Sequence, residues 1–211
     1  MVKIKICGIT SLGDALLAAA AGADFLGFNF YPPSPRYIAP ELVRRILQEL
    51  SSAFQVTPVG VFVNESAETI RRVAAESGVR MIQLHGEEPP EFCRQFERPV
   101  IKALRLAGPE DVEKAAGYAV HALLVDSKTP AYGGSGVAPD WRLAERIAGR
   151  HERVILAGGL TPENVAEAIA AVKPWGVDVA SGVEREPGVK DADQVRRFIA
   201  AASAPSHPEK R

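Results

Sequence analysis

Near the start of the chain lies the stretch Val2-Lys3-Ile4-Lys5-Ile6-Cys7-Gly8-Ile9-Thr10. Apolar and polar residues alternate as far as Cys7, which is the pattern of a β-strand, and Gly8 is placed to end that strand. In an open, doubly wound sheet the first strand commonly leads into a glycine-rich loop that binds a dinucleotide. Cys7-Gly8-Ile9-Thr10 lacks the glycine pattern of such a loop. The first strand therefore favours a different arrangement of parallel strands.

The rest of the chain alternates short apolar runs with longer, alanine-rich amphipathic segments. Thr10 and Ser66 precede two of these segments and are predicted to cap helices at Leu12–Ala21 and Ala67–Ser77. The apolar runs predict eight strands, at Val2–Cys7, Phe25–Phe28, Pro58–Phe62, Met81–Leu84, Val100–Ala103, Ala122–Val125, Val154–Ala157 and Val177–Val179. Eight strand–helix units in 211 residues average about 26 residues each, close to the minimum for such a unit. The sequence therefore predicts an α/β fold, a single (β/α)8 TIM barrel over residues 1–202.

Composition narrows the classes of partner and location. The 25 basic and 26 acidic residues give a formal net charge of −1, which argues against nucleic acid or an anionic membrane surface as a partner. No stretch approaches the roughly 18 apolar residues of a membrane span, and the short alternating start does not resemble a signal peptide. Two cysteines form neither a disulfide framework nor a structural zinc site, so we expect a reducing, cytoplasmic setting. Residues 203–211 are polar, and we expect a disordered tail there.

Glycines cluster after the last three predicted strands, at Gly133–Gly136, Gly158-Gly159 and Ser181-Gly182. In TIM barrels the loops after strands 7 and 8 frequently bind phosphate together with the N-terminus of a short helix. Glycine lets the backbone approach a ligand closely, so that successive N–H groups can point at phosphate oxygens. One isolated pair would be interpreted as a tight turn. Three clusters after three consecutive strands predict a phosphate site, and a site built from backbone amides needs no basic surface.

Cys7 and Asp126 stand at the ends of predicted strands, and each has a structural and a chemical interpretation. A cysteine that ends an apolar strand is commonly a small buried hydrophobic residue, and an aspartate there can cap a turn. Active sites of TIM barrels lie at these strand ends. There a thiolate can act as a general base and a partly protonated carboxyl as a general acid. Cys93 lies in a predicted helix and is expected only to pack.

Three further side chains follow or end predicted strands. Arg36 lies in a proline-rich loop after strand 2, where its planar guanidinium suits a substrate carboxylate, although a solvated surface arginine is the simpler interpretation. His85 follows strand 4 and either hydrogen-bonds a backbone carbonyl or contacts a substrate. Asp178 lies within strand 8 and is either a structural hydrogen-bond acceptor or a substrate contact.

Seven motifs, taken in order, make the sequence similar to the phosphoribosylanthranilate isomerase family, and the similarity covers essentially residues 2–200. They are Lys5-Ile6-Cys7-Gly8-Ile9-Thr10, Ser34-Pro35-Arg36-Tyr37, Gln83-Leu84-His85-Gly86, Asp126-Ser127-Lys128, Gly133-Gly134-Ser135-Gly136 with Asp140-Trp141, Gly158-Gly159-Leu160, and Ser181-Gly182-Val183-Glu184. The resemblance implies a (β/α)8 barrel and an isomerisation of a phosphorylated aminoaldose in tryptophan biosynthesis. It also implies that the enzyme needs neither a metal nor an organic cofactor, and that its small-molecule substrate is phosphorylated.

The resemblance also implies roles for individual residues. Cys7 resembles the general base of the family, Asp126 its general acid, and Arg36 the residue that holds the carboxylate of the anthranilate. The implied phosphate site is formed by the backbone around four residues, Gly136, Gly159, Ser181 and Gly182. One departure is visible, because Pro139 stands where the family usually has phenylalanine. We expect this proline to affect the loop after strand 6 and not the chemistry.

Several alternatives remain open at this point. An indoleglycerol-phosphate synthase would share the phosphate site but needs catalytic lysines, for which only Lys102 and Lys128 are candidates. A metal-dependent ribulose-phosphate epimerase needs several histidine and aspartate ligands at strand ends, and the chain has only four histidines. A silent barrel that only binds a phosphorylated ligand would not require both Cys7 and Asp126. The sequence leaves open whether the chain is a monomer or a homodimer, and whether it accepts a second aminoaldose.

Overall fold

The computed structural model describes residues 1–50, 53–127 and 141–204. Within these ranges eight parallel strands, each paired with the next and β8 with β1, close into a barrel. The strands are β1 Lys3–Cys7, β2 Phe25–Asn29, β3 Thr57–Phe62, β4 Met81–Leu84, β5 Val100–Leu106, β6 Ala122–Ser127, β7 Val154–Leu156 and β8 Gly176–Val179. The predicted TIM barrel is confirmed, and every predicted strand is present within a few residues of its predicted bounds.

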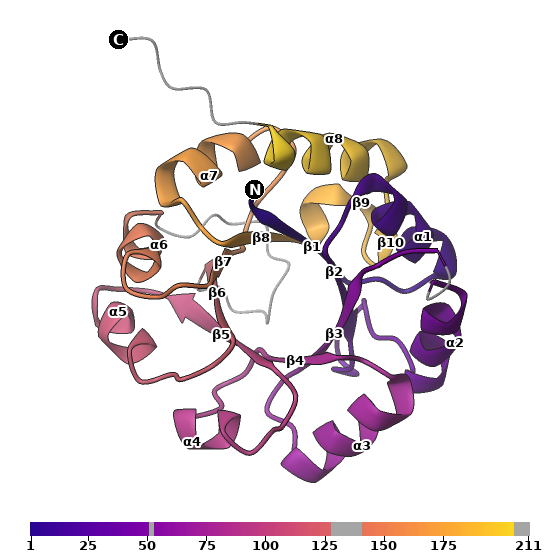
Figure 1. Cartoon of the computed structure of the whole chain (residues 1–211), viewed down its shortest axis with the longest axis horizontal. Coiled ribbons are helices and arrows are strands. Elements are labelled where there is room, and N and C mark those ends of the chain that lie inside the picture. The colour runs from indigo at the N-terminus through magenta and orange to yellow at the C-terminus, as the bar shows by residue number, and fades with distance from the viewer. Residues whose placement is uncertain (51–52, 128–140, 205–211) are drawn as a thin grey trace.

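Helices surround this barrel, as Figure 1 shows in a view along its axis. They are α1 Leu12–Ala21, α2 Pro40–Leu50, α3 Ala67–Ser77, α4 Pro90–Cys93, α5 Glu110–Ala115, α6 Trp141–Ala148, α7 Val165–Val172 and α8 Ala192–Ser203. Between β8 and α8 the chain forms a 3₁₀ turn, η1 Ser181–Val183, and an antiparallel pair, β9 Glu184–Glu186 and β10 Val189–Lys190. The sequence did not predict this pair. No helix in the described ranges combines the length and apolar character needed to cross a bilayer.

The cap of α1 corrects one prediction. Ser11, and not Thr10, caps this helix, because its hydroxyl accepts a hydrogen bond from the N–H of Asp14. Thr10 lies one residue too early in the chain for this geometry, and its hydroxyl donates to the carbonyl of Gly188 instead. The predicted cap of α3 by Ser66 is confirmed. The tail was predicted to begin at Ser203, but Ser203 is the last residue of α8. Residues 205–211 lie outside the described ranges, so for them the disordered tail stays a prediction.

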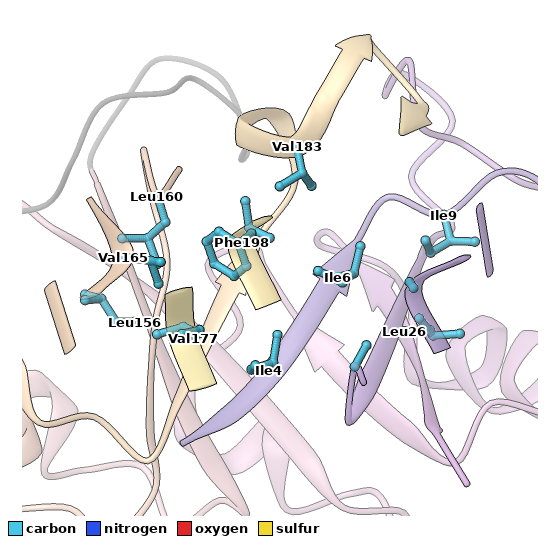
Figure 2. Packing of buried hydrophobic residues seen from close by; sticks show 14 of the residues in the cluster. Ile4, Ile6, Ile9, Leu26, Leu156, Leu160, Val165, Val177, Val183 and Phe198 are labelled. Atoms are coloured by element: carbon cyan, nitrogen blue, oxygen red, sulfur yellow. The ribbon is translucent and has the colours of Figure 1, made fainter. Parts of the chain in front are cut away.

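Alternation along each strand separates two sets of side chains. One set points outward and packs beneath the helices: Ile4 and Ile6 of β1 belong to the same cluster as Val177 of β8 and Phe198 of α8 (Figure 2). The other set points into the barrel, where Ile101 of β5 is one member of a separate apolar cluster. Toward the carboxyl ends of the strands, polar side chains take the inward positions, and these build the site described below.

Candidate active site

A pocket of about 610 Å³, its open mouth included, lies at the carboxyl ends of the strands. The side chains and backbone that line it come from β1, β2, β3, β4, β6 and β8 and from the loops after β1, β2, β4, β7 and β8. The predicted site residues that line this one pocket are Cys7, Arg36, His85, Asp126, Gly159, Asp178, Ser181 and Gly182. Gly136 and Pro139 lie outside the described residues. The pocket therefore brings together every predicted site residue that the structure describes.

Asp126 lies on the inner face of β6 and faces a histidine. Its Oδ2 lies 3.5 Å from Nε2 of His85, while Nδ1 of His85 lies 2.9 Å from the Nε2 amide nitrogen of Gln83. An amide NH₂ group only donates, so Nδ1 accepts and the proton of a neutral His85 is on Nε2, toward Asp126. Within the described residues, His85 Nε2 and Gln83 Oε1 are buried and lack a hydrogen-bond partner. These two atoms are therefore available to a ligand in the pocket.

Cys7 ends β1, which is separated from β6 by β8 and β7 around the barrel (Figure 1), and is a free, partly exposed thiol. Burial raises the pKa of this thiol above its ordinary value, and the negative charge of Asp178 acts in the same direction. The ammonium groups of Lys5 and Lys190 oppose this effect but do not outweigh it. The thiol of the free protein is therefore mostly protonated at neutral pH. A base made from Cys7 depends on the positive charges beside it.

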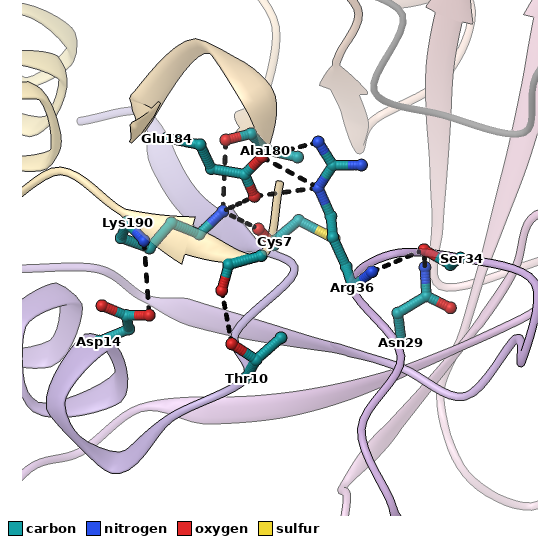
Figure 3. Close-up of polar contacts among 10 residues, drawn as sticks. Cys7, Thr10, Asp14, Asn29, Ser34, Arg36, Ala180, Glu184 and Lys190 are labelled. Atoms are coloured by element: carbon teal, nitrogen blue, oxygen red, sulfur yellow. Dashed lines mark hydrogen bonds and ion pairs between the residues drawn. The ribbon is translucent and has the colours of Figure 1, made fainter. Parts of the chain in front are cut away.

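Arg36 meets a carboxylate of the protein itself. Its Nε lies 2.9 Å from Oε1 of Glu184, and its Nη2 lies 2.7 Å from Oε2 (Figure 3). Lys190 completes the cluster, because its Nζ donates to Oε1 of Glu184 at 2.8 Å and to the backbone carbonyl of Cys7. Burial would raise the pKa of Glu184, but Arg36 and Lys190 hold it below the ordinary value. Within the part of the chain that is described, Glu184 binds Nε and Nη2 of Arg36 but not Nη1, so Nη1 can donate to a substrate carboxylate.

Sequence reasoning did not assign roles to Lys5, Glu184 and Lys190. Glu184 stands in one of the family motifs, which was the available signal. Lys190 follows no predicted strand, and its partner in the cluster becomes a neighbour only through the β9–β10 pair. Lys5 is one of the polar residues of the alternating strand β1; it points into the closed barrel and donates to Oδ1 of Asp178 at 2.8 Å.

The loops after β7 and β8 have the backbone geometry that the glycine clusters predicted. Gly158 and Gly159 both have positive φ angles, 83° and 61°, which residues other than glycine rarely adopt. A Cβ atom at Gly182 would overlap the backbone carbonyl of Leu160, so the two loops can approach this closely only with glycine at that position. Ser181 and Gly182 begin the 3₁₀ turn η1 at the edge of the pocket. Backbone amides of both loops are thus gathered at one end of the pocket.

Lys102, a candidate lysine of the rival synthase, does not enter the pocket. It shares the outward face of β5 with Val100, which packs against α3, and its Nζ donates to Glu88 at 2.6 Å. The other candidate, Lys128, lies outside the described residues. Among the residues that the structure describes, no group of three histidine, cysteine, aspartate or glutamate side chains could hold a metal ion. That the enzyme needs no cofactor stays a prediction.

Comparison with known proteins identifies the family of this barrel. The sequence profile described as N-(5'-phosphoribosyl)anthranilate (PRA) isomerase matches residues 4–201. The N-(5'-phosphoribosyl)anthranilate isomerase of Myxococcus xanthus is 49% identical over 207 residues, which cover 96% of this chain and 97% of the relative. The chain belongs to the N-(5'-phosphoribosyl)anthranilate isomerase family. It is therefore an enzyme, an intramolecular aldose–ketose isomerase of tryptophan biosynthesis.

Two solved isomerases resemble the chain over nearly its whole length. Monomers generated from the dimeric isomerase of Thermotoga maritima are 46% identical with a TM-score of 0.86, and the match covers 96% of this chain and 98% of that one. A second isomerase was solved in complex with reduced 1-(o-carboxyphenylamino)-1-deoxyribulose 5-phosphate. It is 45% identical with a TM-score of 0.85, and the match covers 96% and 98% of the two chains. The sequence comparison and the structural comparison thus identify the same family.

Proposed function

We propose that Asp126 and Cys7 perform the isomerisation as general acid and general base. The substrate, N-(5-phosphoribosyl)anthranilate, is an aminoaldose. A proton from the Asp126 carboxyl to the ring oxygen breaks the bond between C1′ and that oxygen and leaves an iminium between C1′ and the nitrogen. The Cys7 thiolate then removes the proton from C2′, and the C2′–H electrons form a C1′–C2′ double bond while the iminium nitrogen is neutralised. The resulting enolamine tautomerises to the 1-deoxyribulose product.

The observation that carries this proposal is that Cys7 and Asp126 line one pocket from strands β1 and β6. A small sugar held between them can be protonated from one side and deprotonated from the other. His85 supports the acid, because its Nε2–H faces Oδ2 of Asp126 and can stabilise the carboxylate that remains after proton transfer. Asp178 lines the same pocket and is proposed to contact the substrate.

Anchors at the two ends of the substrate would hold the sugar in register. Arg36 is proposed to bind the anthranilate carboxylate, and the amides near Gly159, Ser181 and Gly182, with Gly136 of the loop after β6, are proposed to bind the phosphate. The ligand of the solved relative supports separate carboxylate and phosphate sites, since it carries a carboxyphenyl group at one end and a 5-phosphate at the other. Anchoring at both ends fixes the orientation of the reacting atoms, which is a large part of enzymatic rate enhancement.

The assembly and location of the enzyme belong to the same proposal. The Thermotoga maritima relative is dimeric by its description, which supports a homodimer for this chain, and a monomer is the alternative. We propose that the enzyme works in the cytoplasm with a small phosphorylated substrate and without a membrane or a nucleic acid. A sedimentation experiment at micromolar concentration distinguishes the two assembly states.

The matched cysteines of this chain provide the test. Anthranilate-type fluorescence of the substrate is lost as the reaction proceeds, so turnover can be followed directly. Cys7→Ala is expected to lower turnover by about 10²–10⁴-fold, the range that one general acid–base group contributes. Cys93→Ala, at a buried thiol that ends α4 and does not line the pocket, should leave turnover within about twofold. Near-normal turnover of Cys7→Ala would refute the role of this thiol.

A further inference from the structure

The side chain of Lys5 is buried inside the barrel beside the proposed base, and neither the sequence motifs nor the reaction steps assign it a role. Only 1% of this residue is exposed, although a buried ammonium is costly unless it is paired. Its partner is Asp178 of β8, whose Oδ1 accepts a hydrogen bond from the Nζ of Lys5 at 2.8 Å. Lys5 and Cys7 are two residues apart on β1, so both side chains point to the inner face of the barrel.

Gly27 on the neighbouring strand β2 fixes where the two side chains meet. A Cβ atom built on Gly27 would lie 2.7 Å from the Sγ of Cys7 and 3.0 Å from the Nζ of Lys5. The sulfur and the ammonium therefore border the same small volume, which only a glycine at this position leaves open. Any larger residue would force one of the two groups away. The register of the barrel places Gly27 of β2 beside Cys7, and Cys7 itself lines the pocket.

We propose that Lys5 is a positioning residue for the Cys7 base: its buried ammonium, held in place by Asp178, provides the positive charge that stabilises the ionised sulfur. This inference rests on the proposed function, because it assigns to Lys5 the charge that a thiolate base requires. Asp178 has two effects in this arrangement. It keeps Lys5 charged, and its own negative charge opposes ionisation of the sulfur.

The other charged groups around Cys7 do not replace Lys5. Lys190 of β10 donates to the backbone carbonyls of Cys7 and Ala180 and to Glu184 of β9, so its three hydrogens have acceptors other than the sulfur. Arg36, in the loop after β2, is bound to Glu184 through Nε and Nη2. Lys5 donates to Asp178, and its side chain also hydrogen-bonds the Cys7 thiolate, which lowers the pKa of that thiol.

The charges of these groups support the same reading. Burial alone would lower the pKa of Lys5, but the charges of Asp178 and of the Cys7 thiolate raise it to about 12, so Lys5 stays protonated throughout the working range of pH. Burial raises the pKa of Cys7, and the largest effect opposing it is the charge of Lys5. Asp178 raises the pKa of Cys7 by a smaller amount than Lys5 lowers it. Removal of Lys5 and removal of the charge on Asp178 should therefore shift this pKa in opposite directions.

The test measures the pKa of Cys7 in the full-length protein without any substrate. In a Cys93→Ser background Cys7 is the only thiol, and the rate of its alkylation by iodoacetamide against pH reports the thiolate fraction. Lys5→Met is expected to raise the pKa by about one to three pH units, the effect of an opposite charge at short range. Asp178→Asn, which keeps the shape of the side chain, is expected to lower it. Lys102→Met removes an equally buried lysine elsewhere and should leave the profile of Cys7 unchanged.

Each outcome decides the proposal. A merely structural pair would move both variants in the same direction or not at all, and either result overturns the role of Lys5. If Lys5→Met does not fold, Asp178→Asn alone still decides, since a pKa that fails to fall contradicts the proposal. Alkylation does not depend on turnover. An inactive Cys7→Ala variant together with unshifted profiles would therefore overturn only the role of Lys5, and an active Cys7→Ala variant would overturn the role of the base.

Discussion

Two buried lysines of this barrel are alike in burial and in ion pairing, but they lie on opposite faces of their strands. Lys5 and Lys102 are each 1% exposed, and each is paired with a carboxylate, Asp178 at 2.8 Å and Glu88 at 2.6 Å. Lys5 points to the inner face of the strands, beside the proposed base. Lys102 points to the outer face, beneath the helices, and also donates to the carbonyl of Gly86. The face of the strand, and not burial or pairing, therefore separates a functional charge from a structural one.

We expect changes at the polar inner positions near the carboxyl ends of the strands to reduce catalysis, and changes on the outer face to reduce stability. These polar inner positions, among them Gln83 and Asp126, border the pocket, whereas deeper inner positions such as Ile101 belong to an apolar cluster. Outer positions carry the packing between strands and helices, as Figure 2 shows for Ile6 and Phe198.

The largest effect is expected at the inner face of β6. Asp126→Asn removes the proposed acid while it keeps the shape of the side chain, so we expect turnover to fall by about 10²–10⁴-fold. The melting temperature should change little, because no outward packing is lost. Fluorescence-monitored turnover and thermal denaturation of the same preparation measure both quantities. A variant that loses stability but retains turnover would contradict this expectation at its strongest point.

The outer counterpart is Lys102. Lys102→Met leaves the carboxylate of Glu88 buried without its cation, which typically costs about 3–5 kcal/mol of the free energy of unfolding. Glu88 would keep its hydrogen bonds from the backbone N–H groups of Asn64 and Gly86, so the loop after β4 has other contacts that hold it. Urea denaturation measures the loss. We expect kcat of the folded variant to stay within about twofold, and a large fall in kcat would contradict an outward, structural role.

Arg36, at the rim of the pocket, should show an intermediate effect. Arg36→Lys keeps the positive charge but removes the planar fork that can bind a carboxylate through two donors. We expect KM to rise about tenfold, equivalent to the loss of one hydrogen bond to a charged group, with a much smaller change in kcat. Steady-state kinetics separates the two parameters. If instead kcat falls and KM is unchanged, Arg36 acts on the reacting atoms and not on the anchor.

The smallest effect is expected at a helix cap that does not line the pocket. Ser66→Ala removes the hydroxyl that accepts from the N–H of Thr69 and should cost about 1 kcal/mol of stability. Turnover should be indistinguishable from that of the parent enzyme. A thermal scan run beside the activity assay checks both, and reduced activity without reduced stability would show that the two faces are coupled.

The fold could be predicted from the sequence because both faces of these strands are buried. Parallel strands buried in this way appear as short continuous apolar runs, so Met81–Leu84 was predicted with its observed bounds. The upstream bound of β8 was missed because Gly176 has no apolar side chain to mark it. The cap of α1 was displaced by one residue, since Thr10 and Ser11 both carry a hydroxyl and only the three-dimensional structure selects between them.

The charged surroundings of the pocket could not be predicted, because they depend on closure of the barrel. Lys5 and Asp178 are 173 positions apart and meet only where β1 pairs with β8. Arg36 and Glu184 are 148 positions apart, and the hairpin that holds Glu184 was not predicted. The face of β5 on which Lys102 lies could have been predicted from the sequence. It is two residues from Val100 on β5, so the two side chains share a face.

The most direct test of the central claim is a crystal structure of this chain with the reduced product analogue bound. We expect Sγ of Cys7 within about 3.5 Å of C2′ and the carboxyl of Asp126 on another side of the sugar, at an oxygen that it can protonate. The phosphate should lie on the amides near Gly159 and Gly182, and the carboxyphenyl group should lie at Arg36. A sugar whose C2′ lies out of reach of Cys7, or whose oxygens do not meet Asp126, would contradict the assignment of base and acid.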